Sequence, residues 1–173
     1  MSLEKCLLFH GFVPSEKATL LEKYFETAQF NPGDSIFLKG ESETHTLFVI
    51  LSGEASVQLG PDDSITLKAG DVIGDIGFCD KLPRSAKVVA TSYLNAAVFT
   101  DETFARLKRE LPVHAHRIHE NLTRILAAKI RKMNEVVQAM GLKQQLQATL
   151  ATKPTKESAW SLLVRALNAP LGE

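Results

Sequence analysis

The spacing of hydrophobic residues changes along the chain, and each change predicts a change of secondary structure. Between Pro14 and Ala28 the apolar residues recur every three to four positions, which is the period of an amphipathic α-helix. From residue 30 to residue 99 they alternate with polar residues or form short runs such as TLFVIL, and turn motifs such as PGD and AGD separate them. This second segment predicts roughly seven or more short β-strands.

The strand-rich segment determines the predicted fold class. Short strands at such regular spacing favour a β-sandwich or a jelly-roll barrel over a parallel sheet. We therefore predict an α+β protein in which an antiparallel jelly-roll barrel, a double-stranded β-helix, follows a short N-terminal helix. The helix and the barrel are expected to occupy residues 1–112.

A long helix is predicted for residues 113–141, because the pattern is helical and no proline or glycine interrupts it before Gly141, the predicted stop. At 1.5 Å per residue, roughly 28 residues span about 42 Å, which is more than a compact barrel of this size can cover. We therefore predict a homodimer in which the helix pairs with a second copy, and the alternative is that it folds back on its own barrel. The predicted dimer interface consists of Ile118, Leu122, Ile125, Leu126, Ile130, Met133, Val137 and Met140.

Residues 142–173 are predicted to form a helical tail after the long helix. Its last part is amphipathic, with Trp160, Leu163 and Leu167 on one side. The tail is too short to build a core of its own. It therefore either docks on the rest of the protein or binds a partner.

Charge and cysteine content narrow the range of functions. Lys plus Arg and Asp plus Glu both number 20, so no overall charge attracts nucleic acid or an acidic membrane. No apolar run approaches the ~18 residues of a membrane span. Cys6 and Cys79 have no metal-ligand spacing, which favours a reducing compartment. We expect a cytoplasmic protein without a membrane contact.

Catalytic and metal chemistry have little support in the sequence. His116 and His119 lie one helical turn apart and close to His114, but no further ligand with suitable spacing accompanies them. A solvated helix face is the simpler interpretation. No Ser/His/Asp or Cys/His pairing is indicated either. We therefore expect a non-enzymatic protein that has no metal and no cofactor.

The candidate binding chemistry lies in the segment GDIGFCDKLPRSAKVVA, which begins at Gly74. A turn that contains Gly74 and Gly77 and opens a helix directs backbone N–H groups at one point, as in anion sites. Arg84 adds a guanidinium whose fork matches two phosphate oxygens, and Ser85 adds a hydroxyl donor. The Asp75 carboxylate would repel a phosphate, but it would accept a hydrogen bond from a sugar hydroxyl. These residue types together favour a nucleotide whose phosphate lies near the ribose.

These motifs resemble the cyclic nucleotide-binding domain family, of the catabolite activator and protein kinase A regulatory subunit type. The resemblance covers most of residues 12–140, and the segment from Gly74 to Ser85 is similar to the family's phosphate-binding cassette. It rests on PGDSIFLKGE (32–41), LFVILSGEASV (47–57), GDVIGDIGF (70–78), PRSAKVVA (83–90) and the long helix.

The resemblance implies a ligand and a role for each cassette residue. Arg84 would bind the cyclic phosphate of cAMP or cGMP, assisted by Ser85 and by the amides near Ile76 and Gly77. Asp75 stands where the family usually has glutamate, at the ribose 2′-hydroxyl. Because aspartate is one methylene shorter, this contact is either lost or bridged by water. Another small anionic effector and an empty pocket are the alternatives.

The resemblance also implies how the protein works. In this family the long helix lies at a dimer interface and contributes to the purine site, where Met133 and Asn134 fall. We expect a regulatory sensor in which occupancy of the barrel changes how the cassette packs against the long helix. The alternatives are a ligand-free dimeric interaction module and a shortened transcription regulator. About 30 residues follow Lys143, too few for the family's helix-turn-helix, so this chain alone is not expected to bind DNA.

Overall fold

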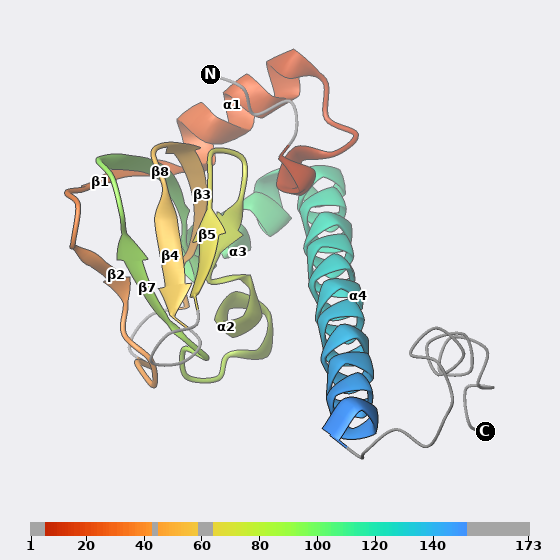
Figure 1. Ribbon diagram of the computed structural model, residues 1–173. Helices are drawn as coiled ribbons and strands as arrows, with labels where there is room; N and C mark the ends of the chain where they lie inside the picture. The colour runs from red at the N-terminus through yellow and green to blue at the C-terminus, as the bar shows by residue number, and fades with distance from the viewer. Residues whose placement is uncertain (1–5, 43–44, 59–63, 152–173) are drawn as a thin grey trace. The chain divides into compact units, whose positions relative to one another are not determined.

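The structure of the protein is a computed structural model that describes residues 6–42, 45–58 and 64–151, with the backbone alone for residue 140 and residues 142–151. Contacts between residues divide the chain into two units, residues 1–127 and residues 128–173. All of the described strands belong to the first unit (Figure 1). The predicted tail from residue 152 onwards lies outside the described residues. Within the described part, no helix is both long enough and apolar enough to cross a membrane.

Helices precede and follow a strand-rich middle segment, and the short helix α2 interrupts it. The helices are the 3-10 turn η1 (Leu7–Phe9), α1 (Pro14–Tyr24), α2 (Asp75–Asp80), α3 (Asp101–Glu110) and α4 (Pro112–Ala151). The strands of the described residues are β1 (Glu26–Phe30), β2 (Ser35–Phe37), β3 (Leu47–Ser52), β4 (Ala55–Gln58), β5 (Ser64–Leu67), β6 (Val72–Ile73), β7 (Lys87–Ala90) and β8 (Leu94–Phe99).

The strands form two four-stranded antiparallel sheets. One sheet has the order β1-β8-β3-β6 and the other has the order β2-β7-β4-β5. Strands that follow one another in sequence therefore mostly lie in opposite sheets, which is the chain path of a jelly roll. The α+β jelly-roll fold predicted from the sequence is confirmed.

Two hydrophobic clusters lie on opposite faces of the β1-β8-β3-β6 sheet. Phe48 and Ile50 of β3 belong to the cluster that fills the space between the two sheets. Leu47 and Val49, which point to the other face because side chains alternate along a strand, belong to the cluster formed with the helices. Burial on both faces explains why β3 reads as an unbroken apolar run in the sequence.

The N-terminal helix is shorter than its periodicity predicts. We predict helix as far as Ala28, but α1 ends at Tyr24 and Glu26–Phe30 forms β1. This segment pairs with β8 in a register that runs from Glu26 opposite Val98 to Phe30 opposite Leu94. Hydrogen bonds along the β8 edge therefore override a local helical pattern that continues for only one more turn.

The long helix extends past its predicted end. Gly141 does not stop α4, which begins at Pro112, contains 40 residues and ends at Ala151. An internal glycine costs a helix only about 1 kcal/mol relative to alanine. The residues that follow, LKQQLQATLA, are mostly good helix formers, so they offset this cost. The predicted boundary between residues 141 and 142 thus lies inside one continuous helix, which the division between residues 127 and 128 also crosses.

The first part of α4 is buried within its own unit, which contradicts part of the predicted dimer interface. Ile118, Leu122 and Ile125 are 0%, 1% and 6% exposed and belong to the core cluster that also contains η1, α1 and α3 residues. These three side chains cannot also form a surface for a second copy. The prediction was wrong for them because the helix-covered face of the barrel already supplies their apolar partner. Leu126 is partly buried.

The predicted interface residues further along α4 are exposed in the second unit. Ile130, Met133 and Val137 are 54%, 60% and 61% exposed. The side chain of Met140 lies outside the described residues. For these positions the dimer interface stays a prediction.

Candidate functional site

The glycine that opens α2 is required by its surroundings. Gly74 adopts a left-handed conformation with φ of 81°, which residues with a side chain rarely adopt. A Cβ atom at this position would lie 2.6 Å from the carbonyl oxygen of Thr46 and 2.9 Å from both the Arg84 Nη1 atom and the Phe37 ring. The site is thus built around a position where the backbone and an arginine approach closely.

The backbone of Arg84 is held by a neighbouring turn. Its N–H donates to the carbonyl of Glu41 at 2.8 Å, and its carbonyl accepts from the N–H of Gly40 at 2.8 Å. Gly40 itself has a positive φ of 84°. The PGDSIFLKGE motif therefore contributes the turn that fixes Arg84 ahead of β7, which begins at Lys87.

The side chain of Arg84 points inward and is only 4% exposed. Its Nη2 atom donates to the Thr46 carbonyl at 2.9 Å and its Nη1 atom donates to the Gly74 carbonyl at 3.3 Å. The guanidinium carbon lies 3.6 Å from the centroid of the Phe37 ring, which is close enough for a cation–π interaction. Burial lowers the pKa of Arg84, and the negative charges of Glu41 and Asp101 oppose this shift.

The structure brings some of the predicted cassette residues together. Gly77 is buried, and a Cβ atom on it would lie 3.3 Å from the Arg84 Nη1 atom, so both cassette glycines lie close to this arginine. Asp75 is 2% exposed on the first turn of α2, whereas Ile76 is 43% exposed and Ser85 is exposed as well. These positions place the cassette around Arg84, and the individual ligand contacts stay predictions.

The two predicted base-contacting residues lie elsewhere in the chain. Met133 and Asn134 belong to the part of α4 in the second unit, and both are exposed. Their exposure leaves them accessible to a ligand or a partner. Their role toward a nucleotide stays a prediction.

Sequence reasoning did not find two of the groups that position Arg84. Phe37 supplies the ring under the guanidinium, and Thr46 accepts through its backbone carbonyl. Phe37 entered the sequence prediction only as part of the PGDSIFLKGE motif, and a carbonyl contact leaves no trace in residue identity. An aromatic residue two positions before the KGE turn was the available signal.

The short helix of the cassette connects this site to the helical core. Phe78, on α2, packs against Phe99 and Phe104 with ring centroids 5.9 Å and 5.6 Å away. Leu122 of α4 belongs to the same buried cluster. A displacement of α2 would therefore disturb the packing of α3 and of the first part of α4.

The three histidines of α4 lie beside carboxylates or an aromatic ring. His114 Nε2 lies 3.4 Å from Glu16 Oε1, and His116 Nε2 lies 3.8 Å from Glu120 Oε1. The ring of His119 stacks on Phe104. In the part of the chain that the structure describes, no group of three or more potential ligands is suited to a metal ion.

Comparison with known proteins places the barrel in a family. Residues 27–110 match the family model of the cyclic nucleotide-binding domain. The chain is 31% identical over 105 residues to a cAMP-dependent protein kinase regulatory subunit from Hypocrea atroviridis, which covers 61% of this chain and 22% of that protein. It is 30% identical over 130 residues to the cyclic AMP receptor protein of Thermus thermophilus, with 72% and 57% covered.

A solved structure agrees with the fold. A cyclic nucleotide-binding domain from Methylobacillus flagellatus matches with a TM-score of 0.69 at 21% identity, over 80% of this chain and 83% of that one. Residues 27–110 therefore match the cyclic nucleotide-binding domain family, as the cassette and hairpin motifs predict, and the solved structure agrees in fold. The chain spans 22% and 57% of the two curated relatives, whose names describe regulatory proteins.

Proposed function

We propose that this protein is a non-enzymatic regulatory sensor that binds a cyclic nucleotide, cAMP or cGMP, in its barrel. The observation that carries the proposal is the position of Arg84, which lies inside the family match and against both cassette glycines. The matched relatives are named for cAMP, which supports a cyclic nucleotide as the ligand class. The choice between cAMP and cGMP depends on groups that contact the base.

Arg84 is the group we propose for the cyclic phosphate. A phosphate oxygen carries more negative charge than a carbonyl, and hydrogen bonds between charged groups are roughly twice as strong as neutral ones. The phosphate would therefore replace the longer of the two carbonyl contacts, from Nη1 to Gly74 at 3.3 Å. The contact with Thr46 and the Phe37 ring would keep the guanidinium in place.

The first turn of α2 supplies the remaining proposed contacts. The first N–H groups of a helix have no acceptor within the helix, so those of Ile76 and Gly77 would donate to the phosphate. The Asp75 carboxylate would accept from the ribose 2′-hydroxyl, directly or through a water molecule. Ser85 would add a hydroxyl donor, for which its exposure leaves room.

Transmission of the signal would use the contact between α2 and the helices. A ligand bound at Gly74–Gly77 would contact the start of α2, the six-residue helix whose residue Phe78 is buried in the core. We propose that the resulting shift reaches the first part of α4 and continues along that helix. The exposed stripe of Ile130, Met133 and Val137 would pair with a second copy, so that the sensor acts as a homodimer.

Calorimetric titration of the full chain with cAMP and cGMP tests the proposed binding. We expect saturable binding that Arg84→Lys weakens about tenfold to a hundredfold, because one or two charge-assisted hydrogen bonds are lost. Arg106→Lys is a matched control, since Arg106 also donates to a backbone carbonyl, that of Lys23, and lies over a ring, that of Tyr24. Circular dichroism must show that each variant is folded.

A ligand-free dimeric interaction module is the second candidate, and the inward contacts of Arg84 favour it. A guanidinium that holds two carbonyls and a ring also has a purely structural use. In that case neither nucleotide releases heat with the folded wild-type protein, while the dimer persists. A shortened transcription regulator that pairs with a DNA-binding relative would instead be recovered as a heterodimer through α4.

A further inference from the structure

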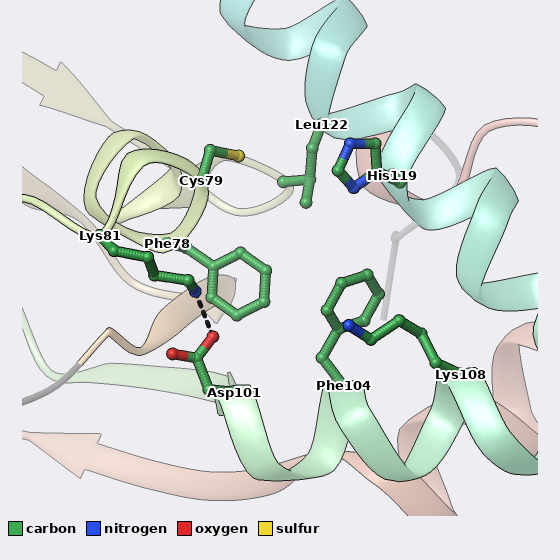
Figure 2. Close-up of a pocket in the computed structure, with 8 residues that line it drawn as sticks. All are labelled: Phe78, Cys79, Lys81, Asp101, Phe104, Lys108, His119 and Leu122. Carbon is green, nitrogen blue, oxygen red and sulfur yellow. Dashed lines mark hydrogen bonds and ion pairs between the residues drawn. The ribbon is translucent and has the colours of Figure 1, made fainter.

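A cavity that does not include Arg84 lies between α2, α3 and α4 of the first unit. Its volume is about 360 Å³, and its apolar wall has one residue from each helix, namely Phe78, Phe104 and Leu122 (Figure 2). Ligand sites in proteins are typically about 300–1,000 Å³ and are lined mainly by hydrophobic and aromatic side chains. The cavity therefore has the size and the lining of a small-molecule site.

The charges at the rim leave one cation uncompensated. Lys81 pairs with Asp101, so their charges cancel (Figure 2). Lys108 lies with its Nζ atom 5.0 Å from the Phe104 ring centroid. Among the described residues, no carboxylate lies within ion-pair distance of Lys108. The polar end of the cavity thus matches a single negative charge.

His119 adds a second polar group, which like Lys108 lies beside Phe104. Its ring is nearly parallel to that of Phe104, with 10° between the planes and 6.5 Å between the centroids. Figure 2 shows the side chains of His119, Phe104, Phe78 and Leu122 around a common space. The cation and the imidazole therefore lie beside the apolar wall, as an amphipathic ligand requires.

An adjoining cavity extends the site along α4. It has a volume of about 470 Å³, shares Phe104, Lys108 and His119 with the first cavity, and continues to Pro112 and Ala115. The shared residues place the cation between two apolar compartments. A ligand with an elongated apolar body has room on either side of its charged group.

We propose that this cavity is a second ligand site, which binds a small monocarboxylate with an aromatic or aliphatic body. The carboxylate meets Lys108 and His119, and the apolar body lies against Phe78, Phe104 and Leu122. A ligand with several charges is disfavoured, because the apolar wall offers no partner for the additional charges.

Occupancy of the second site affects the cassette through α2. This consequence rests on the proposed function, because Phe78 and the cassette residue Asp75 belong to the same short helix. A ligand that favours one position of α2 changes the affinity for the cyclic nucleotide, and the nucleotide changes the affinity of the second site by the same factor. The binding itself is independent of any nucleotide and is tested without one.

A native cysteine reports on the site. Cys79 lines the cavity and is exposed, whereas Cys6, the other cysteine of the sequence, is 2% exposed. Burial raises the pKa of the Cys79 thiol, with further contributions from Asp75 and Asp80 and an opposing one from Lys81. A raised pKa lowers the fraction of reactive thiolate at neutral pH and so slows alkylation of the thiol.

The test measures the rate at which monobromobimane alkylates Cys79 in the full chain, while 4-phenylbutyrate is titrated in. We expect saturable protection, and we expect the uncharged 4-phenylbutan-1-ol to need about a tenfold higher concentration for the same protection, because it lacks the charge-assisted contact. Absence of protection at about 10 mM 4-phenylbutyrate, a concentration that detects even weak binding, overturns the proposal. Equal protection by the acid and the alcohol overturns the role of Lys108 and His119.

A substitution locates the carboxylate contact. Lys108→Met keeps the apolar stem and removes the charge, so we expect it to weaken 4-phenylbutyrate binding about tenfold and leave binding of the alcohol unchanged. Lys68→Met is the matched control, because Lys68 is an exposed lysine that neighbours Glu54 and lines neither cavity. Unchanged binding of the acid by folded Lys108→Met protein contradicts the proposed site. Calorimetry with the same two ligands checks that the protection reflects binding.

Discussion

The two parts of α4 continue one hydrophobic stripe but have opposite environments. In residues 112–127 the stripe residues Ile118, Leu122 and Ile125 are at most 6% exposed, because they pack on the helices and sheet of their own unit. In residues 128–139 every residue is exposed, including Ile130 and Val137. The difference shows that a helical stripe identifies a buried face without identifying its partner.

The largest expected loss of stability comes from a substitution in the buried part of α4. Ile118→Ala leaves a cavity in the core, and we expect it to lower the free energy of unfolding of the first unit by about 2–5 kcal/mol. Ile130→Ala is the matched substitution in the exposed part and should change that free energy by less than about 0.5 kcal/mol. Urea unfolding at low protein concentration measures both. Similar losses for the two variants would contradict the division of α4.

A charged residue introduced into the exposed part of α4 should weaken association of the proposed dimer rather than destabilise the fold. Burial of one methionine side chain contributes about 1.5–3 kcal/mol. A homodimer contains two copies of Met133, so Met133→Asp removes this contribution twice. We therefore expect the dimer dissociation constant to rise about a hundredfold or more. Sedimentation velocity measures this change. Lys132→Asp introduces the same charge at the adjacent residue, and an equal loss of dimer there would indicate a non-specific charge effect.

A buried amide provides a third comparison between the two parts of α4. Asn121 is 0% exposed and donates to the carbonyls of Leu8 and His10, each at 2.9 Å. Asn121→Ala leaves these acceptors unpaired, and we expect a loss of about 1–3 kcal/mol in the free energy of unfolding. Asn134→Ala, in the exposed part, should leave it nearly unchanged. Thermal unfolding of both variants without ligand distinguishes the two positions.

The smallest expected effect concerns an ion pair on the exposed part. Lys132 Nζ lies 3.2 Å from Glu135 Oε2, and both side chains are largely exposed. Pairs of this kind typically contribute about 0.2–1 kcal/mol and are screened by salt. Glu135→Gln should therefore change the helix content by an amount that disappears at high salt. A salt-independent change would mean that Glu135 has a structural role beyond this pair.

Much of the fold follows from the local pattern of hydrophobic and turn residues. The features that were missed depend on contacts between segments far apart in the sequence. The jelly roll and the approximate start of the long helix agree with periodicity and turn residues. The β1 strand was missed because its pairing with β8 is a contact between residues far apart in sequence. The burial of Ile118 was assigned to a second chain because the surface of the helix-covered sheet cannot be read from α4 alone.

The close approach of Gly74, Gly77 and Arg84 was predictable from the sequence, whereas the detailed geometry was less so. Glycines at 74 and 77 and the arginine at 84 form a motif because close approach and charge limit which residues are tolerated. The inward direction of Arg84 depends on the Thr46 carbonyl and the Phe37 ring, and the sequence does not show how these are placed. The cavity beside Phe78 joins three helices, so no single segment of the sequence indicates it.

Amide hydrogen exchange of the full chain, measured with and without saturating cAMP or cGMP, tests the central claim most directly. The account predicts slower exchange in residues 74–85 and an altered rate in residues 112–127, since α2 contacts both the site and the core. Arg84→Lys should diminish both changes at the same ligand concentration. Unchanged exchange in residues 74–85 of the folded wild-type protein with either nucleotide would contradict the account.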